Sequence, residues 1–287
     1  MLYSREGVDQ GDPTSMDAYA MGNMPMVVAM KREVPEALQP WFADDGATVG
    51  RAVNNAKCLA YLRDHGPERG FVLEEDKCTY VCTLEDEPIA RAAFIAEGFT
   101  QIEFKRGSRY LGGFVGSASK KEAWLEAKVG EWVECMEALA RIADLHPQAV
   151  YAAFTFCLQG EWQYVQRVVP GTAAHFGPLE EAIRDRLLPA LLAIPRDDIS
   201  AEFRQVLTHS VKTGGLAVRN PVKTGVANYA TSQLAAAHLV KSLVDSEVTF
   251  SRLEHTLTCV AAGKAARLSR LTDESAFLAG RGQNDPS

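Results

Sequence analysis

The chain has 287 residues, a formal net charge of −7 and a pI of about 5.5, an acidic balance that argues against a protein whose main task is wrapping nucleic acid. That objection is weaker for a polymerase, which concentrates positive charge in one channel. Hydrophobic residues make up 47% and charged residues 23%, as is ordinary for a soluble globular protein. The six cysteines lack metal-site spacing, and the sequence has neither a membrane-length apolar run nor a signal peptide. We therefore expect reduced thiols, no membrane partner and an intracellular location, nuclear or cytoplasmic.

From Thr14 the apolar residues recur at steps of three and four, which predicts a helix that kinks or ends early at Pro25. Its expected buried face is Met16, Tyr19, Ala20, Met24, Val27 and Val28. Residues 41–50 then predict a strand, a tight turn and a second strand, with Gly46 supplying backbone freedom. We expect residues 42–43 to pair with residues 47–49, so that Asp44 and Asp45 lie at the hairpin tip and both face one concave surface.

Further along the chain, a helix is predicted over 53–65, a strand over 78–84, a helix over 88–97 and strands near 100–105 and 109–115. After Ser119 the pattern is helical, with apolar faces over 125–143 and 179–192 and further helices near 223–244 and 246–270. The expected fold class is therefore α+β. It would comprise a mixed domain over 1–118, a helical region over 119–279 that lacks a sheet of its own, and a disordered tail over 280–287.

Asp44-Asp45 is the pair with the clearest potential for chemistry. Two adjacent carboxylates repel each other unless a cation lies between them, and Mg²⁺ prefers oxygen ligands. The alternative is a solvated Asp-Asp-Gly turn, which is common and which this short segment alone would favour.

Several segments in order resemble the motifs of retrotransposon-type reverse transcriptases, which are RNA-directed DNA polymerases. Residues 4–13 (SREGVDQGDP) are similar to the second palm motif, and residues 42–45 (FADD) to the aromatic-x-Asp-Asp hairpin of the third. Residues 66–77 are similar to the fourth motif, which ends in a lysine, and residues 110–112 to the Leu-Gly hairpin that follows. Gly214-Gly215-Leu216 with Asn220-Pro221 is similar to a late segment of these polymerases. The resemblance covers about residues 2–116 and continues more loosely to about 221.

The resemblance implies a partial palm followed by an all-α, thumb-like region, with RNA template, DNA primer and deoxynucleoside triphosphates as partners. Asp44 and Asp45 would bind Mg²⁺ or Mn²⁺, and Lys77 would lie near the departing pyrophosphate, unless it is a solvated lysine. The expected nucleotide and template contacts are Ser4, Arg5, Gln10 and Gly11. The expected primer contacts, unless they form a solvated hairpin face, are Lys105, Arg106, Arg109, Leu111 and Gly112.

The family's first palm motif contributes another metal-binding aspartate, and it lies upstream of the segment that begins at Ser4. Only three residues precede Ser4 in these 287, so we expect the chain to be inactive alone, as a gene-model fragment, a degenerate remnant or part of a split polymerase. One alternative is a non-catalytic nucleic-acid-binding or scaffolding remnant of a retroelement. Another is an unrelated α+β enzyme that uses Asp44-Asp45 for metal-dependent hydrolysis.

Overall fold

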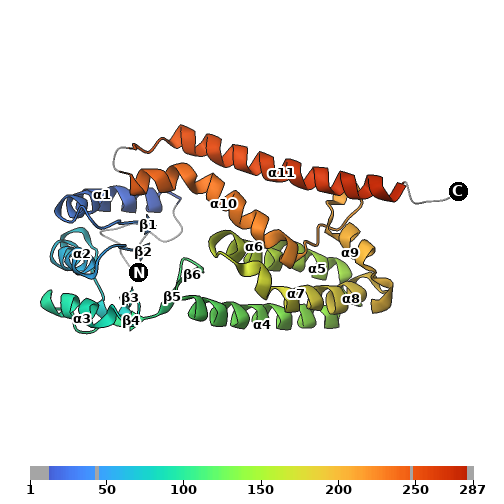
Figure 1. The fold of residues 1–287 in the computed structure, drawn as a ribbon, viewed down its shortest axis with the longest axis horizontal. Coiled ribbons are helices and arrows are strands. Elements are labelled where there is room, and N and C mark those ends of the chain that lie inside the picture. Colours follow the sequence, from blue (N-terminus) through green and yellow to red (C-terminus); the bar gives the residue numbers. More distant parts are fainter. Residues whose placement is uncertain (1–12, 43–44, 246–247, 283–287) are drawn as a thin grey trace, which may run out of the picture. The chain divides into compact units, whose positions relative to one another are not determined.

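The computed structural model describes residues 13–42, 45–245 and 248–282, and the chain divides into two compact units, Met1–Ser108 and Arg109–Ser287 (Figure 1). The first unit mixes helices with short strands, whereas the second is helical apart from one hairpin at its start. The coarse prediction of an α+β protein is therefore confirmed. Within the described residues, no helix is both long and apolar enough to cross a membrane.

Unit 1 contains two small pairs of strands set among helices. An antiparallel pair, β1 (Trp41–Phe42) and β2 (Asp45–Gly46), follows α1 (Ser15–Glu33). A parallel pair, β3 (Thr79–Val81) and β4 (Glu103–Lys105), is joined through α3 (Glu87–Ala96). The remaining elements are α2 (Ala52–His65) and the 3-10 turns η1 (Pro67–Arg69) and η2 (Glu75–Lys77). Parallel strands need such a crossover connection, which the predicted strand–helix–strand order supplies.

The predicted buried face of α1 is wrong. Met16 and Met24 are more than half exposed, whereas the buried side chains are Asn23, Met26 and Met30. Methionine occurs on both sides of this helix, so apolar spacing alone does not distinguish them. The helix also continues through Pro25, because the carbonyl that loses its hydrogen bond belongs to Met21, on the exposed side where water can solvate it.

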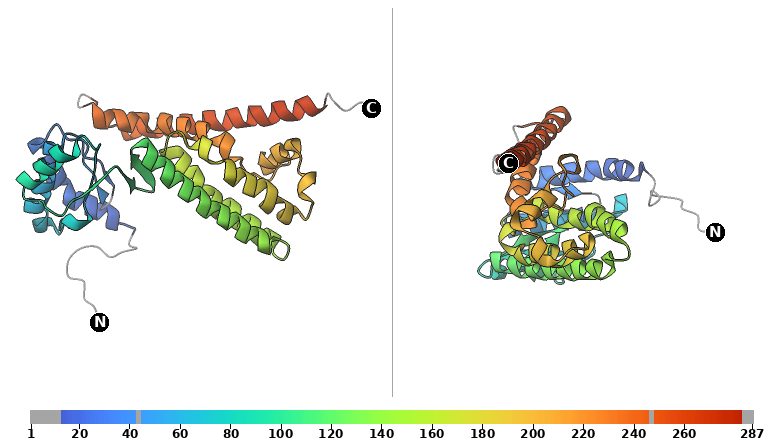
Figure 2. Two further views of the ribbon diagram at one scale, coloured as in Figure 1. Left: turned by 60° about the horizontal axis from the view of Figure 1, so that its bottom comes forward. Right: turned by 90° about the vertical axis from the view of Figure 1, so that its right-hand side faces the viewer.

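The hairpin of β5 (Gly107–Tyr110) and β6 (Gly113–Gly116) begins at the last two residues of unit 1 and otherwise belongs to unit 2. The bundle follows as α4 (Ala118–Ala143), α5 (Pro147–Ala152), η3 (Ala153–Leu158), α6 (Gln159–Val168), η4 (Thr172–His175), α7 (Gly177–Ala182), η5 (Ile183–Leu187), α8 (Leu188–Leu192), η6 (Arg196–Asp198), α9 (Ala201–Thr208) and η7 (Val211–Thr213). Two long helices, α10 (Pro221–Val244) and α11 (Arg252–Gly282), then run side by side at its edge (Figures 1 and 2). No strand occurs in the described residues beyond Gly116, as predicted for the helical region.

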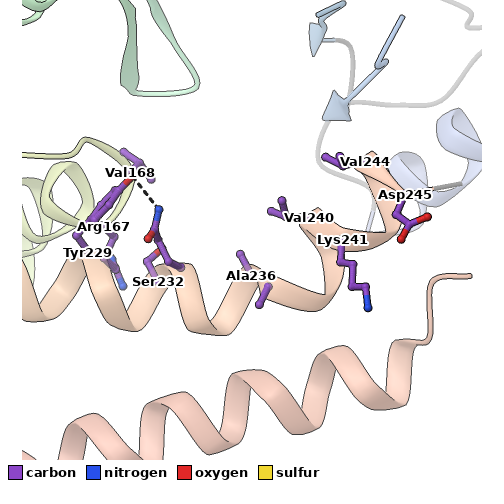
Figure 3. Close-up of a pocket in the computed structure, with 11 residues that line it drawn as sticks. Arg167, Val168, Tyr229, Ser232, Ala236, Val240, Lys241, Val244 and Asp245 are labelled. Carbon is purple, nitrogen blue, oxygen red and sulfur yellow. Dashed lines mark hydrogen bonds between the residues drawn. The ribbon is translucent and has the colours of Figure 1, made fainter. Parts of the chain in front are cut away.

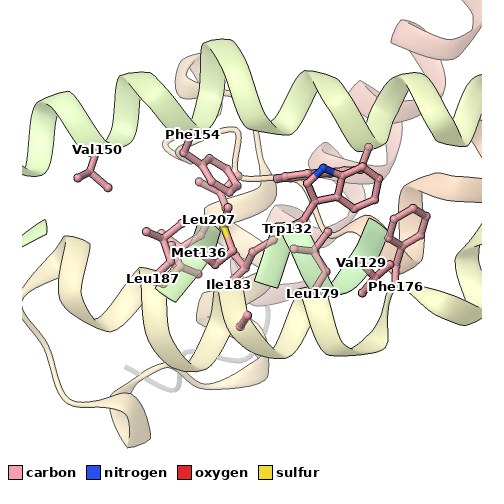
Figure 4. Close-up of a cluster of buried hydrophobic side chains, with 14 of the residues drawn as sticks. Val129, Trp132, Met136, Val150, Phe154, Phe176, Leu179, Ile183, Leu187 and Leu207 are labelled. Atoms are coloured by element: carbon pink, nitrogen blue, oxygen red, sulfur yellow. The ribbon is translucent and has the colours of Figure 1, made fainter. Parts of the chain in front are cut away.

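The core of unit 2 forms around the predicted apolar face of α4 (Figure 4). Leu125, Val129, Trp132 and Met136 are buried there, which confirms the helical spacing. The Trp132 ring stacks on Phe176, with centroids 5.9 Å apart, and its Nε1 donates to the Glu161 carboxylate at 2.9 Å. A buried indole N–H usually has such an acceptor.

The end of α11 differs from the prediction of a disordered tail from residue 280. The helix continues to Gly282, and residues 283–287 lie outside the described part of the chain. Its start also differs, because α10 ends at Val244 and α11 begins at Arg252.

Candidate functional site

The Asp44-Asp45 pair falls between β1 and the end of β2 in the sequence, and the pairing of these strands differs from the predicted one. Phe42 lies opposite Asp45 and Trp41 opposite Gly46, so Asp45 is a residue of the second strand. The backbone pairing continues outward to Leu38 and Val49, with N–O distances of 2.8 and 2.9 Å. Asp44 itself lies outside the described residues, as do Ser4, Arg5, Gln10 and Gly11.

The hairpin is held to the helices of unit 1 by Trp41. This indole packs against the buried cluster that includes Met30 and Cys58, and it meets Phe71 edge-on with ring centroids 5.8 Å apart. It also covers Gly46, where an added Cβ would lie 2.9 Å from the indole ring. Glycine is therefore required here to leave room for Trp41, rather than for the backbone freedom expected from the sequence, since Gly46 is not among the described positive-φ residues.

The carboxylate of Asp45 is not engaged by a described cation. Asp45 is exposed, and no described lysine, arginine or histidine forms an ion pair with it. An exposed carboxylate suits Mg²⁺, which keeps several waters in its shell. Among the described residues, no three His, Cys, Asp or Glu side chains converge as a metal site, so Asp45 would need ligands beyond those described.

Lys77 lies at the end of η2, before β3, and pairs with Glu74 one turn earlier. Hydrogen bonding to this carboxylate raises the pKa of the Lys77 ammonium. The neighbouring Glu75 carboxylate accepts from the backbone N–H groups of Thr100 and Gln101. Thus two of the acidic residues that precede Lys77 already have partners within unit 1.

Two of the basic residues predicted to contact the primer, Lys105 and Arg106, form ion pairs within unit 1. Arg106 pairs with Glu87 and donates to the carbonyls of Cys82 and Thr83, at 3.2 and 3.1 Å. Together these contacts fasten the end of β4 to the start of α3, which is a structural role that sequence reasoning missed. Lys105 pairs with the exposed Glu103 at 2.6 Å, an interaction that exchanges readily with water or phosphate.

The Leu111-Gly112 turn joins β5 to β6 in unit 2. Both residues have positive φ, 45° and 74°, which is the mirror-image turn expected of a tight hairpin. The Tyr164 hydroxyl donates to the Leu111 carbonyl, and an added Cβ on Gly112 would lie 3.0 Å from the same ring. On the other side, Phe114 stacks on Trp124 of α4, with centroids 5.4 Å apart. This hairpin is therefore anchored to both α4 and α6.

The segment with Gly214-Gly215 and Asn220-Pro221 is fixed by buried polar side chains that sequence reasoning did not single out. Gln159 donates to the Ala217 carbonyl and accepts from the Arg219 N–H at 3.2 and 2.7 Å. Gln166 donates to the Pro221 carbonyl at 2.7 Å and is fully buried. The sequence does carry a signal for this role. Two glutamines lie seven residues apart on the same side of a helix whose apolar residues Trp162 and Val165 are buried, and a buried amide needs hydrogen-bond partners.

A shallow groove of about 680 Å³ runs beside α10 where that helix extends past the end of α6 (Figure 3). Its walls are mostly apolar, with charged groups at both ends. Its lining residues are Arg167, Val168, Tyr229, Ser232, Gln233, Ala236, Ala237, Val240, Lys241, Val244 and Asp245. All of them belong to unit 2, whereas Asp45 and Lys77 belong to unit 1.

No family model, curated protein or solved structure matches the chain.

Proposed function

We propose that the chain is the C-terminal part of a retrotransposon-type RNA-directed DNA polymerase, and that its β1–β2 hairpin contributes carboxylates to the nucleotidyl-transfer site. The observation that carries the proposal is the position of the Asp-Asp pair. Asp45 begins the second of two short antiparallel strands that follow a long helix, and Asp44 precedes it in the sequence. The pair lies downstream of a segment similar to the second palm motif.

Divalent ions bound at such a site would activate the attacking primer hydroxyl and offset the charge of the departing pyrophosphate. Asp45 supports this role by its exposure and by the lack of an ion pair with any described cation. Trp41 would hold the hairpin rigidly against unit 1, because its ring packs both on Gly46 and on the buried cluster. Lys77 is the proposed cation for the departing pyrophosphate, and it would have to exchange Glu74 for phosphate.

The site needs at least one further carboxylate from a separate strand. Glu74 and Glu75 are poor sources, because one pairs with Lys77 and the other caps the backbone at Thr100 and Gln101. The family resemblance implies that the missing aspartate lies in a segment that precedes Ser4 in the polymerase.

The test is to fuse the fingers and first palm motif of a retrotransposon polymerase in front of Met1 and to measure primer extension on an RNA template with Mg²⁺. We expect extension that is abolished by Asp44→Ala and strongly reduced by Asp45→Ala. The matched control is Asp64→Ala, which removes an exposed carboxylate of α2 and should leave extension unchanged. Extension that survives Asp44→Ala would overturn the proposed role of the hairpin.

A further inference from the structure

His209 follows α9 and is buried without a hydrogen-bond partner for its ring. The residue is 1% exposed, and neither Nδ1 nor Nε2 has a partner among the described residues. Its backbone is fixed, because its N–H donates to the Val206 carbonyl at 2.9 Å and its carbonyl accepts from the Ala217 N–H at 2.7 Å. A neutral imidazole always carries one N–H, so this ring holds at least one buried, unsatisfied donor.

The C-terminal part of α11 lies over this imidazole. Phe277 meets it edge-on, with ring centroids 5.3 Å apart and the planes at 90°. Three residues earlier, the buried Glu274 carboxylate accepts from Ser210 N and Thr213 Oγ1 at 3.2 and 2.9 Å. At this point α11 has run past the start of α10 and over the loop that follows α9 (Figure 1). The His209 ring therefore reaches water when these contacts of α11 open.

A proton on the His209 ring would find no carboxylate available to it. The charged groups near it come from α7, α9, η7, the segment before α10 and α11. They are Glu180 with its partner Arg204, Lys212, Arg219, Arg270 and Glu274. Glu274 already accepts from Ser210 and Thr213 and pairs with Arg219 at 3.3 Å. Arg270 lies close enough to Arg219 that partial burial and this second cation lower the pKa of its guanidinium. A further positive charge is thus opposed by burial and by its neighbours.

We infer that residues 268–280 of α11 dock in a pH-sensitive way, packed on the loop after α9 while His209 is neutral and released when His209 takes up a proton just below neutral pH. An imidazolium carries two N–H donors, and neither would have an acceptor beneath the docked helix. Water solvates both donors once the helix is released. A fall in pH through the histidine range therefore shifts the population toward the released state.

The other titratable groups that hold α11 respond differently. Burial alone would raise the pKa of the Glu274 carboxyl, but the hydrogen bonds that it accepts outweigh this effect and the pKa is lowered. Its contribution to docking is lost only as the pH falls through that lowered pKa, well below the histidine range. At the start of α11, the His238 Nδ1 lies 3.3 Å from the Glu254 carboxylate, so protonation there strengthens the contact. His255 lies against Cys259 of the same helix, with 3.7 Å between Nε2 and Sγ.

The test is hydrogen exchange, read by mass spectrometry, on the 287-residue chain at pH values from about 7.5 to about 5.5 and corrected for intrinsic exchange rates. A released helix end frays, because a short helix without tertiary contacts is marginally stable, so exchange reports release. We expect the protection of residues 268–280 to fall by about tenfold over this range, the limit set by titration of a solvated imidazole. The protection of residues 252–262 should stay constant or rise.

Two substitutions of His209 remove the titrating group. His209→Phe keeps an aromatic ring against Phe277, so residues 268–280 should stay protected at about pH 5.5. His209→Gln carries the same expectation and serves if the larger ring disturbs folding, which circular dichroism checks. His146→Gln, at an exposed histidine before α5, is the matched control and should retain the tenfold fall.

Constant protection of residues 268–280 in the wild-type chain, or the same fall in both His209 variants, would overturn the inference. An equal fall over residues 252–262 and 268–280 would also overturn it, because it would indicate general acid unfolding. The inference is independent of the proposed polymerase function, since the exchange measurement requires neither metal nor primer.

Discussion

Arg204 and Glu180 form a two-pronged ion pair inside unit 2, with Nε–Oε1 and Nη2–Oε2 distances of 2.7 and 2.8 Å. Arg204 is 5% exposed and Glu180 is 9% exposed. The remaining guanidinium nitrogen of Arg204 donates to the Val218 carbonyl at 2.8 Å. One side chain of α9 thus joins α7 to the segment that leads into α10, and every strong donor and acceptor of the pair has a partner.

Removing one member of this pair should destabilise unit 2 strongly. Arg204→Ala leaves the Glu180 carboxylate buried without its cation, and we expect a loss of about 3–5 kcal/mol in the free energy of unfolding by urea. Glu181→Ala, one residue away and exposed, is the control and should change it by less than about 0.5 kcal/mol. If Arg204→Ala changed the free energy of unfolding as little as Glu181→Ala does, the ion pair would contribute little to stability.

The two adjacent glycines after η7 should respond differently to alanine. An added Cβ at Gly215 would lie 2.3 Å from the His209 carbonyl oxygen and 2.5 Å from that of Val206, so the backbone would have to move. We expect Gly215→Ala to cost about 3 kcal/mol or more. Gly214 has positive φ but open space around it, so Gly214→Ala should cost only about 1–2 kcal/mol. Thermal unfolding of both variants in parallel tests the order.

Sequence patterns predicted local structure well and long-range contacts poorly. The face of α4 was predictable, because Leu125, Val129, Trp132 and Met136 repeat with the helical period and are buried. The buried side of α1 was not predictable, because methionines lie on its exposed and buried sides alike. The register of the hairpin also differed, because the packing of Trp41 over Gly46 draws Asp45 into the second strand.

The contacts that fix the candidate sites depend on residues far apart in the sequence. Arg106 reaches Glu87, Gln159 reaches Ala217, and Tyr164 reaches Leu111. No spacing rule links such pairs, so their roles emerge only in three dimensions. The resemblance to polymerase motifs could name Asp44, Asp45 and Lys77, but not the side chains that position the segments around them.

The cysteines should differ sharply in reactivity. Cys58 is fully buried, and burial raises the pKa of its thiol to about 11, although Lys31 and Gln39 act in the opposite direction. Because the thiolate is the reactive form, Cys58 should resist Ellman's reagent at pH 8 until the chain unfolds. Cys157 is exposed and should react at once. Cys157→Ala should remove the fast phase, and rapid labelling of Cys58 in the native chain would contradict its burial.

The 287-residue chain alone should show no measurable primer extension on an RNA template, even with millimolar Mg²⁺ or Mn²⁺. Two cations bridged by substrate phosphates need carboxylates from two separate strands, and the hairpin supplies only Asp44 and Asp45. Without the additional aspartate the ions lose a shared ligand, and their mutual repulsion should leave one position largely empty. Asp44→Ala should then change nothing in this assay.

The informative contrast is with the fusion that restores the upstream motif, where the same Asp44→Ala substitution should abolish extension. If the unfused wild-type chain extends a primer and Asp44→Ala stops it, another acidic residue must replace the missing ligand. Asp76 would be the first to test, because Glu74 is paired with Lys77 and Glu75 with the Thr100 and Gln101 N–H groups. Asp76→Asn should then remove the activity while Glu75→Gln lowers stability, and measuring extension and urea unfolding on the same preparations separates the two effects.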